Sequence, residues 1–256
     1  MRIVVVGGGV MGATLLAGFA QHGYDEVAVI EKLDERAAQL RADGFTVVDD
    51  VAGADVVLLA VKPQDMTTTI ASLKIPDGAL VISIAAGVTI STFEALLPNH
   101  AVIRSMPNTP AQVGLGVTAL SPGSNVSEES LELAKRLLGT VGEVVVVPEQ
   151  LQNAVTAVSG SGPAYLFYLA EGMLAGALAQ GLAPDVAETL VRQTLLGAST
   201  LLARSEVDAA ELRRRVSSPN GTTVAAIGAF DDREMKAAIE AGVAAAAQRG
   251  KELSGG

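Results

Sequence analysis

The sequence predicts an α/β protein in which a doubly wound sheet, residues 1–149, precedes an all-α domain, residues 150–256. Short runs of β-branched and other apolar residues alternate with helix-like segments through the first half of the chain. Pro148 ends this alternation, and beyond it Ala, Leu and Gly recur at helical spacing without a further strand. A chain of 256 residues is long enough for two such domains.

The first 31 residues predict strand, glycine turn and helix. The β-branched run 2–6 stops at Gly7, and Gly7, Gly9 and Gly12 form a G-x-G-x-x-G frame. Gly7 permits a sharp turn, Gly9 lets the backbone approach a pyrophosphate, and Gly12 lets the helix pack closely on the strand. Glu31 follows the second apolar run, where an acidic residue accepts hydrogen bonds from an adenosine ribose. This pattern favours a Rossmann-like dinucleotide-binding domain over a plain tight turn.

The other elements follow from the same periodicities. The run 54–61 is apolar on both faces, which is typical of a parallel strand covered by helices on either side. Asp34 is the expected N-cap of a short helix. Expected strands are residues 2–6, 27–30, 45–48, 54–61, 80–84, 102–106, 116–120 and 143–147; expected helices are 11–22, 34–42, 127–138, 152–180, 184–204, 208–216, 224–229 and 231–253.

Small and stiff residues follow three of the expected strands. They are Lys62-Pro63, Ala85-Ala86-Gly87 and the loop 107–110. Ligands of doubly wound sheets bind at the carboxyl ends of the strands, and small side chains there leave room for a flat ring. The alternative is that these are ordinary loop residues.

Composition excludes several classes of function. A formal net charge of −10 argues against a nucleic-acid partner and an anionic membrane surface, which both reward clustered Lys and Arg. The chain has no cysteine, so disulfides, thiolate metal sites and a cysteine nucleophile are excluded, and we expect no metal. Met1-Arg2 leads directly into a strand without signal-peptide architecture. We therefore expect a cytoplasmic protein.

The second half carries two clusters of Gly, Ser and Thr, residues 159–164 and 217–223. Thr222 and Thr223 stand where the next helix begins. Free backbone N–H groups at a helix start, with hydroxyls beside them, suit a carboxylate ligand. The alternative is an N-capped loop between helices.

The residue types that are missing limit the classes of reaction that the protein could catalyse. Alcohol and hydroxy-acid dehydrogenases usually need a general base such as His or Lys. His22 and His100 are expected to be solvated surface residues, and no lysine occurs between Lys135 and Lys236. An electrophilic substrate needs no such base. A protonated cyclic imine needs only to be oriented and hydrogen-bonded at its ring nitrogen.

Together these segments make the whole chain resemble the pyrroline-5-carboxylate reductases, the last enzymes of proline biosynthesis. The glycine frame belongs to the match, but residues 154–165 and 212–227 are far more specific. Shorter matching segments are 60–63, 85–87 and 106–110. The resemblance implies NAD(P)H-dependent hydride transfer to the imine carbon of L-1-pyrroline-5-carboxylate, giving L-proline.

The resemblance also implies site residues. Thr223 resembles the catalytic group, whose hydroxyl donates a hydrogen bond to the substrate nitrogen and could supply its proton. The substrate-binding residues are Glu149, near the ring, with Ser218, Gly221, Thr222 and Thr223. Pattern and resemblance together predict the cofactor-binding residues Val6, Gly7, Gly8, Gly9, Val10, Met11, Gly12, Glu31, Lys32, Ala60, Val61, Lys62, Pro63, Ala85, Ala86, Gly87 and Asn108.

One departure from the family affects the choice between NADPH and NADH. Many relatives have a small polar residue where this chain has Glu31, followed by Lys32. A carboxylate repels the 2′-phosphate of NADPH, whereas Lys32 or Arg36 could reach the same phosphate. The usual cofactor of the family favours NADPH only slightly, so we expect either NADPH or NADH.

The resemblance further implies a homodimer with interlocked helical domains, which can assemble into a decamer. Three other functions are weighed against it. A hydroxy-acid dehydrogenase is disfavoured by the missing lysine, and a reductase of another cyclic imine by the complete cluster 218–223. A dinucleotide sensor without turnover is disfavoured because the substrate cluster is kept beside the cofactor frame.

Overall fold

The computed structural model describes residues 1–254. By its internal contacts the chain forms two compact units. The sheet unit comprises residues 1–163 and the chain from Ala245 on, and the helical unit comprises Ala164–Ala244. Helix α11 (Met235–Leu253) begins in the helical unit and ends in the sheet unit. The division expected between residues 149 and 150 rests on sequence pattern and stays a prediction.

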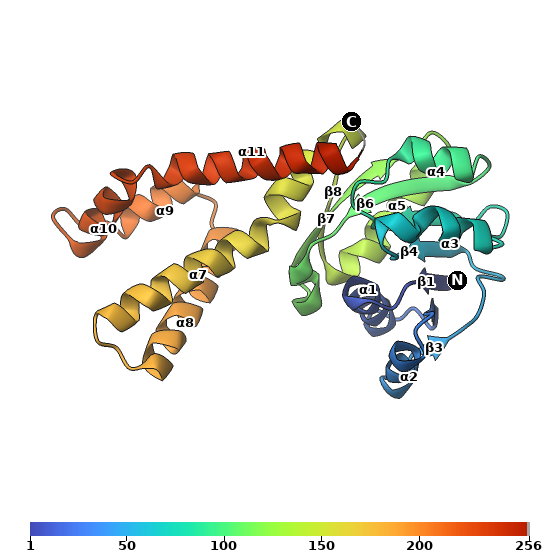
Figure 1. Ribbon diagram of the computed structural model, residues 1–256, viewed down its shortest axis with the longest axis horizontal. Coiled ribbons are helices and arrows are strands. Elements are labelled where there is room, and N and C mark those ends of the chain that lie inside the picture. The colour runs from blue at the N-terminus through green and yellow to red at the C-terminus, as the bar shows by residue number, and fades with distance from the viewer. Residues whose placement is uncertain (255–256) are drawn as a thin grey trace. The chain divides into compact units, whose positions relative to one another are not determined.

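The sheet unit contains one eight-stranded sheet with the order β3-β2-β1-β4-β5-β6-β7-β8 (Figure 1). The chain fills one half of the sheet with β1, β2 and β3 and then returns to place β4 on the other side of β1. This reversal confirms the doubly wound prediction. The strands are β1 (Arg2–Val6), β2 (Glu26–Ile30), β3 (Thr46–Val47), β4 (Val56–Leu59), β5 (Leu80–Ser83), β6 (Ala101–Met106), β7 (Gly116–Pro122) and β8 (Gly142–Val146).

The far edge of the sheet is not parallel to the rest. Strands from β3 to β6 pair in parallel, but β7 runs antiparallel to β6, and β8 is parallel to β7. The chain from Met106 to Gly116 includes only the short 3-10 helix η2 (Thr109–Val113). A parallel crossover needs about a dozen or more residues, so this short connection turns the chain back on itself.

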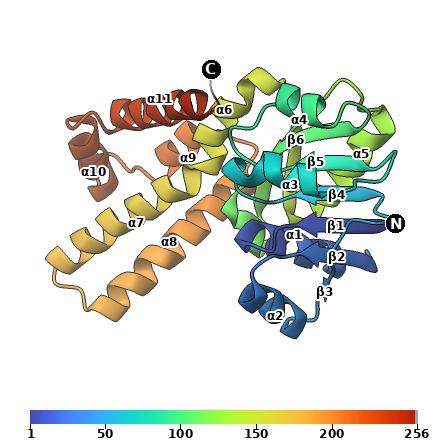
Figure 2. The same cartoon turned by 45° about the vertical axis from the view of Figure 1, so that its right-hand side comes forward.

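Helices cover both faces of the sheet, as expected (Figures 1 and 2). In β1, Ile3 and Val5 pack with α1, α2 and α5, while Val4 and Val6 pack with α3 and α4 on the opposite face. Alternate residues of one strand therefore enter two separate cores. The helices are α1 (Val10–Gln21), α2 (Asp34–Ala42), α3 (Met66–Ser72), α4 (Ile90–Leu96) and α5 (Glu128–Leu138), with the 3-10 helices η1 (Pro63–Asp65), η3 (Gly139–Val141) and η4 (Glu149–Leu151).

Some local expectations are wrong. The N-cap of α2 is Leu33 rather than Asp34, and no side chain caps this helix. Helices α3 and α4 have seven residues each and were not individually predicted, because so short a segment shows little periodicity. The expected strand 54–61 is shortened to Val56–Leu59, although the Asp55 and Ala60 N–H groups still donate to Arg2 and Val6 of β1.

Two long helices expected in the second half are interrupted. The expected helix 152–180 consists of α6 (Gln152–Val155), the π-helical turn η5 (Thr156–Gly160) and α7 (Gly162–Ala179). Ser, Gly and Pro have low helix propensity, which explains the break in this segment. The expected helix 231–253 begins only at Met235, after a turn in which Glu234 has φ 52. The other helices are α8 (Pro184–Arg204), α9 (Ala209–Arg215) and α10 (Thr222–Asp231).

The helical unit has almost no core of its own. Of its residues, 164–244, only Ala187 and Val191 are buried. Helices α7 and α8 lie side by side (Figures 1 and 2), and Phe167 and Tyr168 on α7 are 62% and 78% exposed. So much exposed apolar surface is typical of an interaction face. Within residues 1–254, no helix combines the length and apolarity needed to cross a lipid bilayer.

Candidate functional site

The glycine turn connects β1 to α1. Gly7 has φ +106, a conformation that residues with a side chain rarely adopt. A Cβ added at Gly12 would overlap the Gly7 carbonyl oxygen and lie 3.2 Å from the Ala60 Cβ atom. Only glycine therefore allows α1 to approach the end of β1 this closely.

The N-terminus of α1 suits a pyrophosphate. Gly9 is its N-cap, no side chain accepts a hydrogen bond there, and the first turn holds no acidic residue. A Cβ at Gly9 would meet no atom within 4 Å, so the space above the turn is free. Backbone N–H groups and the positive end of the helix dipole favour an anion at such a position. The residues present therefore fit the predicted dinucleotide.

Glu31 follows β2 and holds the glycine turn from the side. Its Oε2 accepts a hydrogen bond from the Gly8 N–H at 2.9 Å, and its Oε1 accepts one from the Leu33 N–H at 2.9 Å. Arg36 Nε donates to the Gly8 carbonyl at 2.7 Å, while Lys32 is exposed. Both carboxylate oxygens of Glu31 thus already accept hydrogen bonds from backbone N–H groups. Arg36 contacts the glycine turn directly, which its place in the sequence did not indicate.

The other predicted cofactor segments meet the glycine turn at one edge of the sheet. Strands β1, β4 and β5 are parallel neighbours, so the residues that follow them share the carboxyl edge. The Ala60 N–H donates to the Val6 carbonyl at 2.8 Å, which joins the 60–63 segment to the glycine turn. In the 85–87 segment, Ala85 is buried and Ala86 is exposed.

Asn108 lies beyond β6 at the same edge and is buried. Its Oδ1 accepts a hydrogen bond from the Val117 N–H at 2.9 Å, and its Nδ2 donates to the Ser159 carbonyl at 3.2 Å. The amide therefore joins the loop 107–110 to β7 and to the π-helical turn. Its predicted position near the nicotinamide stays a prediction.

Glu149 is held by two other segments of the sheet unit. Its Oε1 accepts hydrogen bonds from the Ile90 N–H at 2.7 Å and from Arg104 Nη1 at 2.9 Å. The side chain of Arg104 is only 6% exposed and that of Glu149 is 30% exposed. Sequence reasoning did not single out Arg104, although an arginine within the apolar strand 101–106 is a signal that could have found it.

The predicted substrate cluster belongs to the helical unit. Gly221 is the N-cap of α10, no side-chain hydrogen bond caps this helix, and its first turn holds no acidic residue. The Gly221 N–H donates to the Ser218 carbonyl at 3.0 Å, and Asn220 has φ 57. Thr222 and Thr223 form the first turn of α10. This arrangement leaves helix N–H groups and hydroxyls for a carboxylate.

Both histidines lie away from the carboxyl edge of the sheet. His22 ends α1, where its Nδ1 lies 2.8 Å from the Gly18 carbonyl oxygen. His100 precedes β6 at the amino edge, and the expectation that it is solvated is wrong. Its ring nitrogens are buried and have no hydrogen-bond partner among residues 1–254. Neither is therefore placed as a general base at this edge.

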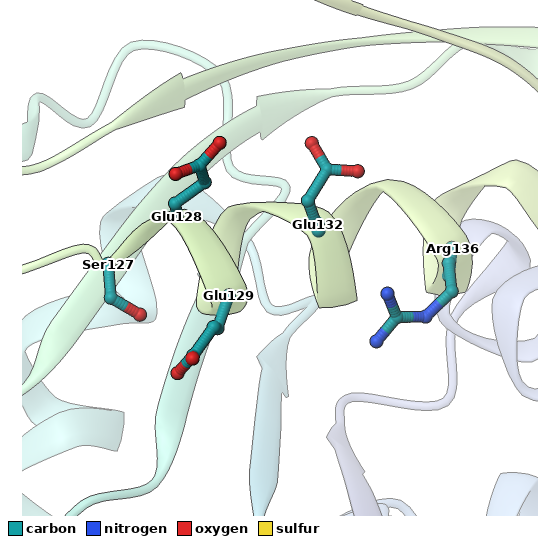
Figure 3. Close-up of a pocket in the computed structure, with 5 residues that line it drawn as sticks. All are labelled: Ser127, Glu128, Glu129, Glu132 and Arg136. Carbon is teal, nitrogen blue, oxygen red and sulfur yellow. The ribbon is translucent and has the colours of Figure 1, made fainter.

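Figure 3 shows a pocket on the exposed face of α5. Its five labelled side chains, Ser127, Glu128, Glu129, Glu132 and Arg136, come from α5 and its N-cap. None of them is a predicted site residue. The three carboxylates point outward from one helix (Figure 3), so we assign no ligand to this pocket.

Comparison with known proteins covers nearly the entire chain. A pyrroline-5-carboxylate reductase from Synechocystis sp. is 40% identical over 99% of this chain and 98% of its own, and one from Pseudomonas aeruginosa is 40% identical over 99% and 97%. The chain belongs to the pyrroline-5-carboxylate reductase family. Residues 149–253 match the model of pyrroline-5-carboxylate reductase dimerisation, and residues 2–87 match that of NADP oxidoreductases, coenzyme F420-dependent.

Solved structures agree with this assignment. A pyrroline-5-carboxylate reductase from Coxiella burnetii has a TM-score of 0.91 and 33% identity, covering 99% of this chain and 98% of its own. A Plasmodium falciparum pyrroline carboxylate reductase with NADP bound has a TM-score of 0.87 at 23% identity, covering 99% and 98%, and shows the shared fold. The family resemblance and the two-part α/β fold expected from the sequence are confirmed.

The contact at Gly12 leads to the first prediction. Gly12→Ala should lower both the melting temperature and the affinity for NADPH, because overpacking against backbone costs about 1–3 kcal/mol. Gly9→Ala should not lower the melting temperature, since its methyl group meets no protein atom. It should weaken NADPH binding, because the methyl group enters the space predicted for the pyrophosphate. Differential scanning calorimetry and titration of NADPH measure the two effects.

Gly139→Ala is the matched control, because a Cβ there also meets no atom within 4 Å and the residue lies outside the glycine turn. It should change neither quantity. A stable Gly12→Ala variant with unchanged NADPH affinity would contradict the close-packing argument.

Proposed function

We propose that this chain reduces L-1-pyrroline-5-carboxylate to L-proline with NADPH or NADH, as the pyrroline-5-carboxylate reductase family does. The observation that carries the proposal is 40% identity to reductases of that name over 99% of the chain. The glycine turn and the open N-terminus of α1 support the cofactor part, because they suit a pyrophosphate. The first turn of α10 supports the substrate part.

On the cofactor side, the residues of this chain would bind the nicotinamide dinucleotide and orient its ring. Backbone N–H groups from Gly9 to Met11 would hold the pyrophosphate at the N-terminus of α1, since the Gly8 N–H already donates to Glu31. The segments 60–63 and 85–87 and Asn108 would line the space for the nicotinamide at the carboxyl edge of the sheet. When bound, NADPH or NADH supplies the hydride. Glu31, Lys32 and Arg36 would contact the adenosine ribose.

On the substrate side, the residues orient an electrophile that needs little activation. Ser218, Gly221 and Thr222 would hold the carboxylate at the N-terminus of α10. The Thr223 hydroxyl would donate a hydrogen bond to the lone pair of the neutral ring nitrogen and would supply the proton that becomes the N–H of proline as hydride reaches the imine carbon. Glu149 would lie near the ring. Holding the imine carbon at the correct distance from the hydride would lower the barrier by positioning alone.

The proposal includes a homodimer. The substrate cluster belongs to the helical unit, whereas the predicted cofactor-binding residues belong to the sheet unit. Exposed apolar side chains on α7 and α8, such as Phe167 and Leu190, support a second copy that covers the helical unit. The matched dimerisation model supports the same arrangement. We extend the proposal to a homodecamer assembled from such dimers, and to a cytoplasmic location, where nicotinamide cofactors are regenerated.

The proposal is tested by oxidation of NADPH and NADH, followed as the loss of absorbance at about 340 nm, with pyrroline-5-carboxylate and purified full-length protein. Rapid turnover and formation of proline are expected. Cofactor binding without turnover would contradict the proposal and would favour another cyclic imine substrate or a dinucleotide sensor.

Thr223→Ala tests the proposed hydrogen bond to the ring nitrogen. Its loss should lower kcat about 10-fold or more, which corresponds to about 1.4 kcal/mol of transition-state stabilisation. Thr200→Ala is the control, because the Thr200 hydroxyl donates to the Leu196 carbonyl on α8, outside the cluster. An unchanged kcat in Thr223→Ala would remove this residue from the reaction.

Glu31→Ser tests the choice of cofactor. Removing the carboxylate should raise kcat/KM for NADPH relative to NADH by about 10-fold, because an acidic residue there repels the 2′-phosphate. Glu35→Ser is the control, since Glu35 is an exposed carboxylate in the first turn of α2. If the ratio stays the same in Glu31→Ser, Glu31 does not set the preference.

A further inference from the structure

The Ala85–Thr89 turn joins β5 to α4 and contains three residues predicted to line the cofactor space. Its ends are buried, because Ala85 and the following Ile90 are both inaccessible, whereas Ala86 at its middle is exposed. Gly87 has φ +78. The exposed middle of the turn therefore lies between two buried ends, Ala85 and Ile90. The interactions that hold these two residues determine the shape of the turn.

The first end is held from within β5 and from β6. The Ala85 N–H donates to the Ser83 hydroxyl at 3.2 Å, and the Ser105 hydroxyl donates to the Ser83 carbonyl at 2.9 Å. Ser83 is 0% exposed and Ser105 is 1% exposed. Buried hydroxyls are costly unless they are paired, so these two bonds fix the end of β5.

The second end is held by a charged group. The Ile90 N–H donates to Glu149 Oε1, and the same oxygen accepts from Arg104 Nη1. Arg104 and Ser105 are consecutive residues of β6, so their side chains leave opposite faces of the sheet. A buried guanidinium requires its carboxylate partner, and this requirement keeps Glu149 over the N-terminus of α4.

We propose that Ser83 and Arg104, the latter acting through Glu149, are positioning residues that hold the Ala85–Thr89 turn in the shape that binds the nicotinamide cofactor. The inference rests on the proposed function, which places Ala85, Ala86 and Gly87 beside the cofactor. Neither side chain contacts the cofactor itself. Each acts through a backbone N–H group at one end of the turn.

The test measures the dissociation constants of NADPH and NADH by calorimetry, together with kcat and both KM values, on full-length protein. Ser83→Ala should weaken cofactor binding about fivefold, the loss expected for one hydrogen bond. Arg104→Met should weaken it about 10-fold or more, and Arg104→Lys, which keeps a cation beside Glu149, should restore part of the loss. In Ser83→Ala, kcat at saturating cofactor should stay within about twofold of wild type.

Ser121→Ala is the matched control. Ser121 is a buried serine on β7 whose hydroxyl donates to the Val147 carbonyl at 2.8 Å, so its loss should also lower the melting temperature. It should leave cofactor affinity unchanged. Lower melting temperatures with wild-type cofactor affinity in Ser83→Ala and Arg104→Lys would overturn the inference, even if Arg104→Met does not fold. Wild-type protein that binds cofactor but reduces no imine would overturn the proposed function alone.

Discussion

The close approach of α1 to the end of β1 is the constraint on which the cofactor side of this protein depends. At Gly12 a single methyl group would strike the Gly7 carbonyl, so the helix can begin where it does only because both positions are glycine. This contact directs the free N–H groups of α1 toward the carboxyl edge of the sheet. Glu31 and Arg36 then fix the backbone at Gly8, Glu31 through the N–H and Arg36 through the carbonyl.

Around this edge, polar groups within the sheet unit hold the loops in place. Ser83, Ser105, Asn108 and Arg104 are all buried, and each bonds a backbone group or a carboxylate at the end of a neighbouring segment. Leaving a buried polar group unpaired destabilises the folded protein more than pairing it stabilises the fold. These groups therefore specify one arrangement of the loops. A preformed pocket binds a cofactor without the cost of ordering its walls.

The helical unit follows a different physical rule. Its helices expose large apolar side chains, and of residues 164–244 only two alanine- or valine-sized side chains are buried. Such a surface is stable in water when another surface covers it. The dimerisation model that matches residues 149–253 is consistent with this need. The predicted substrate cluster at the start of α10 belongs to the same unit, so in the proposed function substrate binding and assembly use one part of the chain.

The sequence by itself determined the doubly wound sheet, the glycine turn and the helical second half, because strand and helix periodicities and glycine spacing are local signals. It also identified the family through residues 154–165 and 212–227. The tertiary structure alone decided the pairing of Arg104 with Glu149 and the hydrogen bond from Ser105 to the Ser83 carbonyl. These features depend on which segments become neighbours, and residues 45 positions apart leave no periodic trace of their contact.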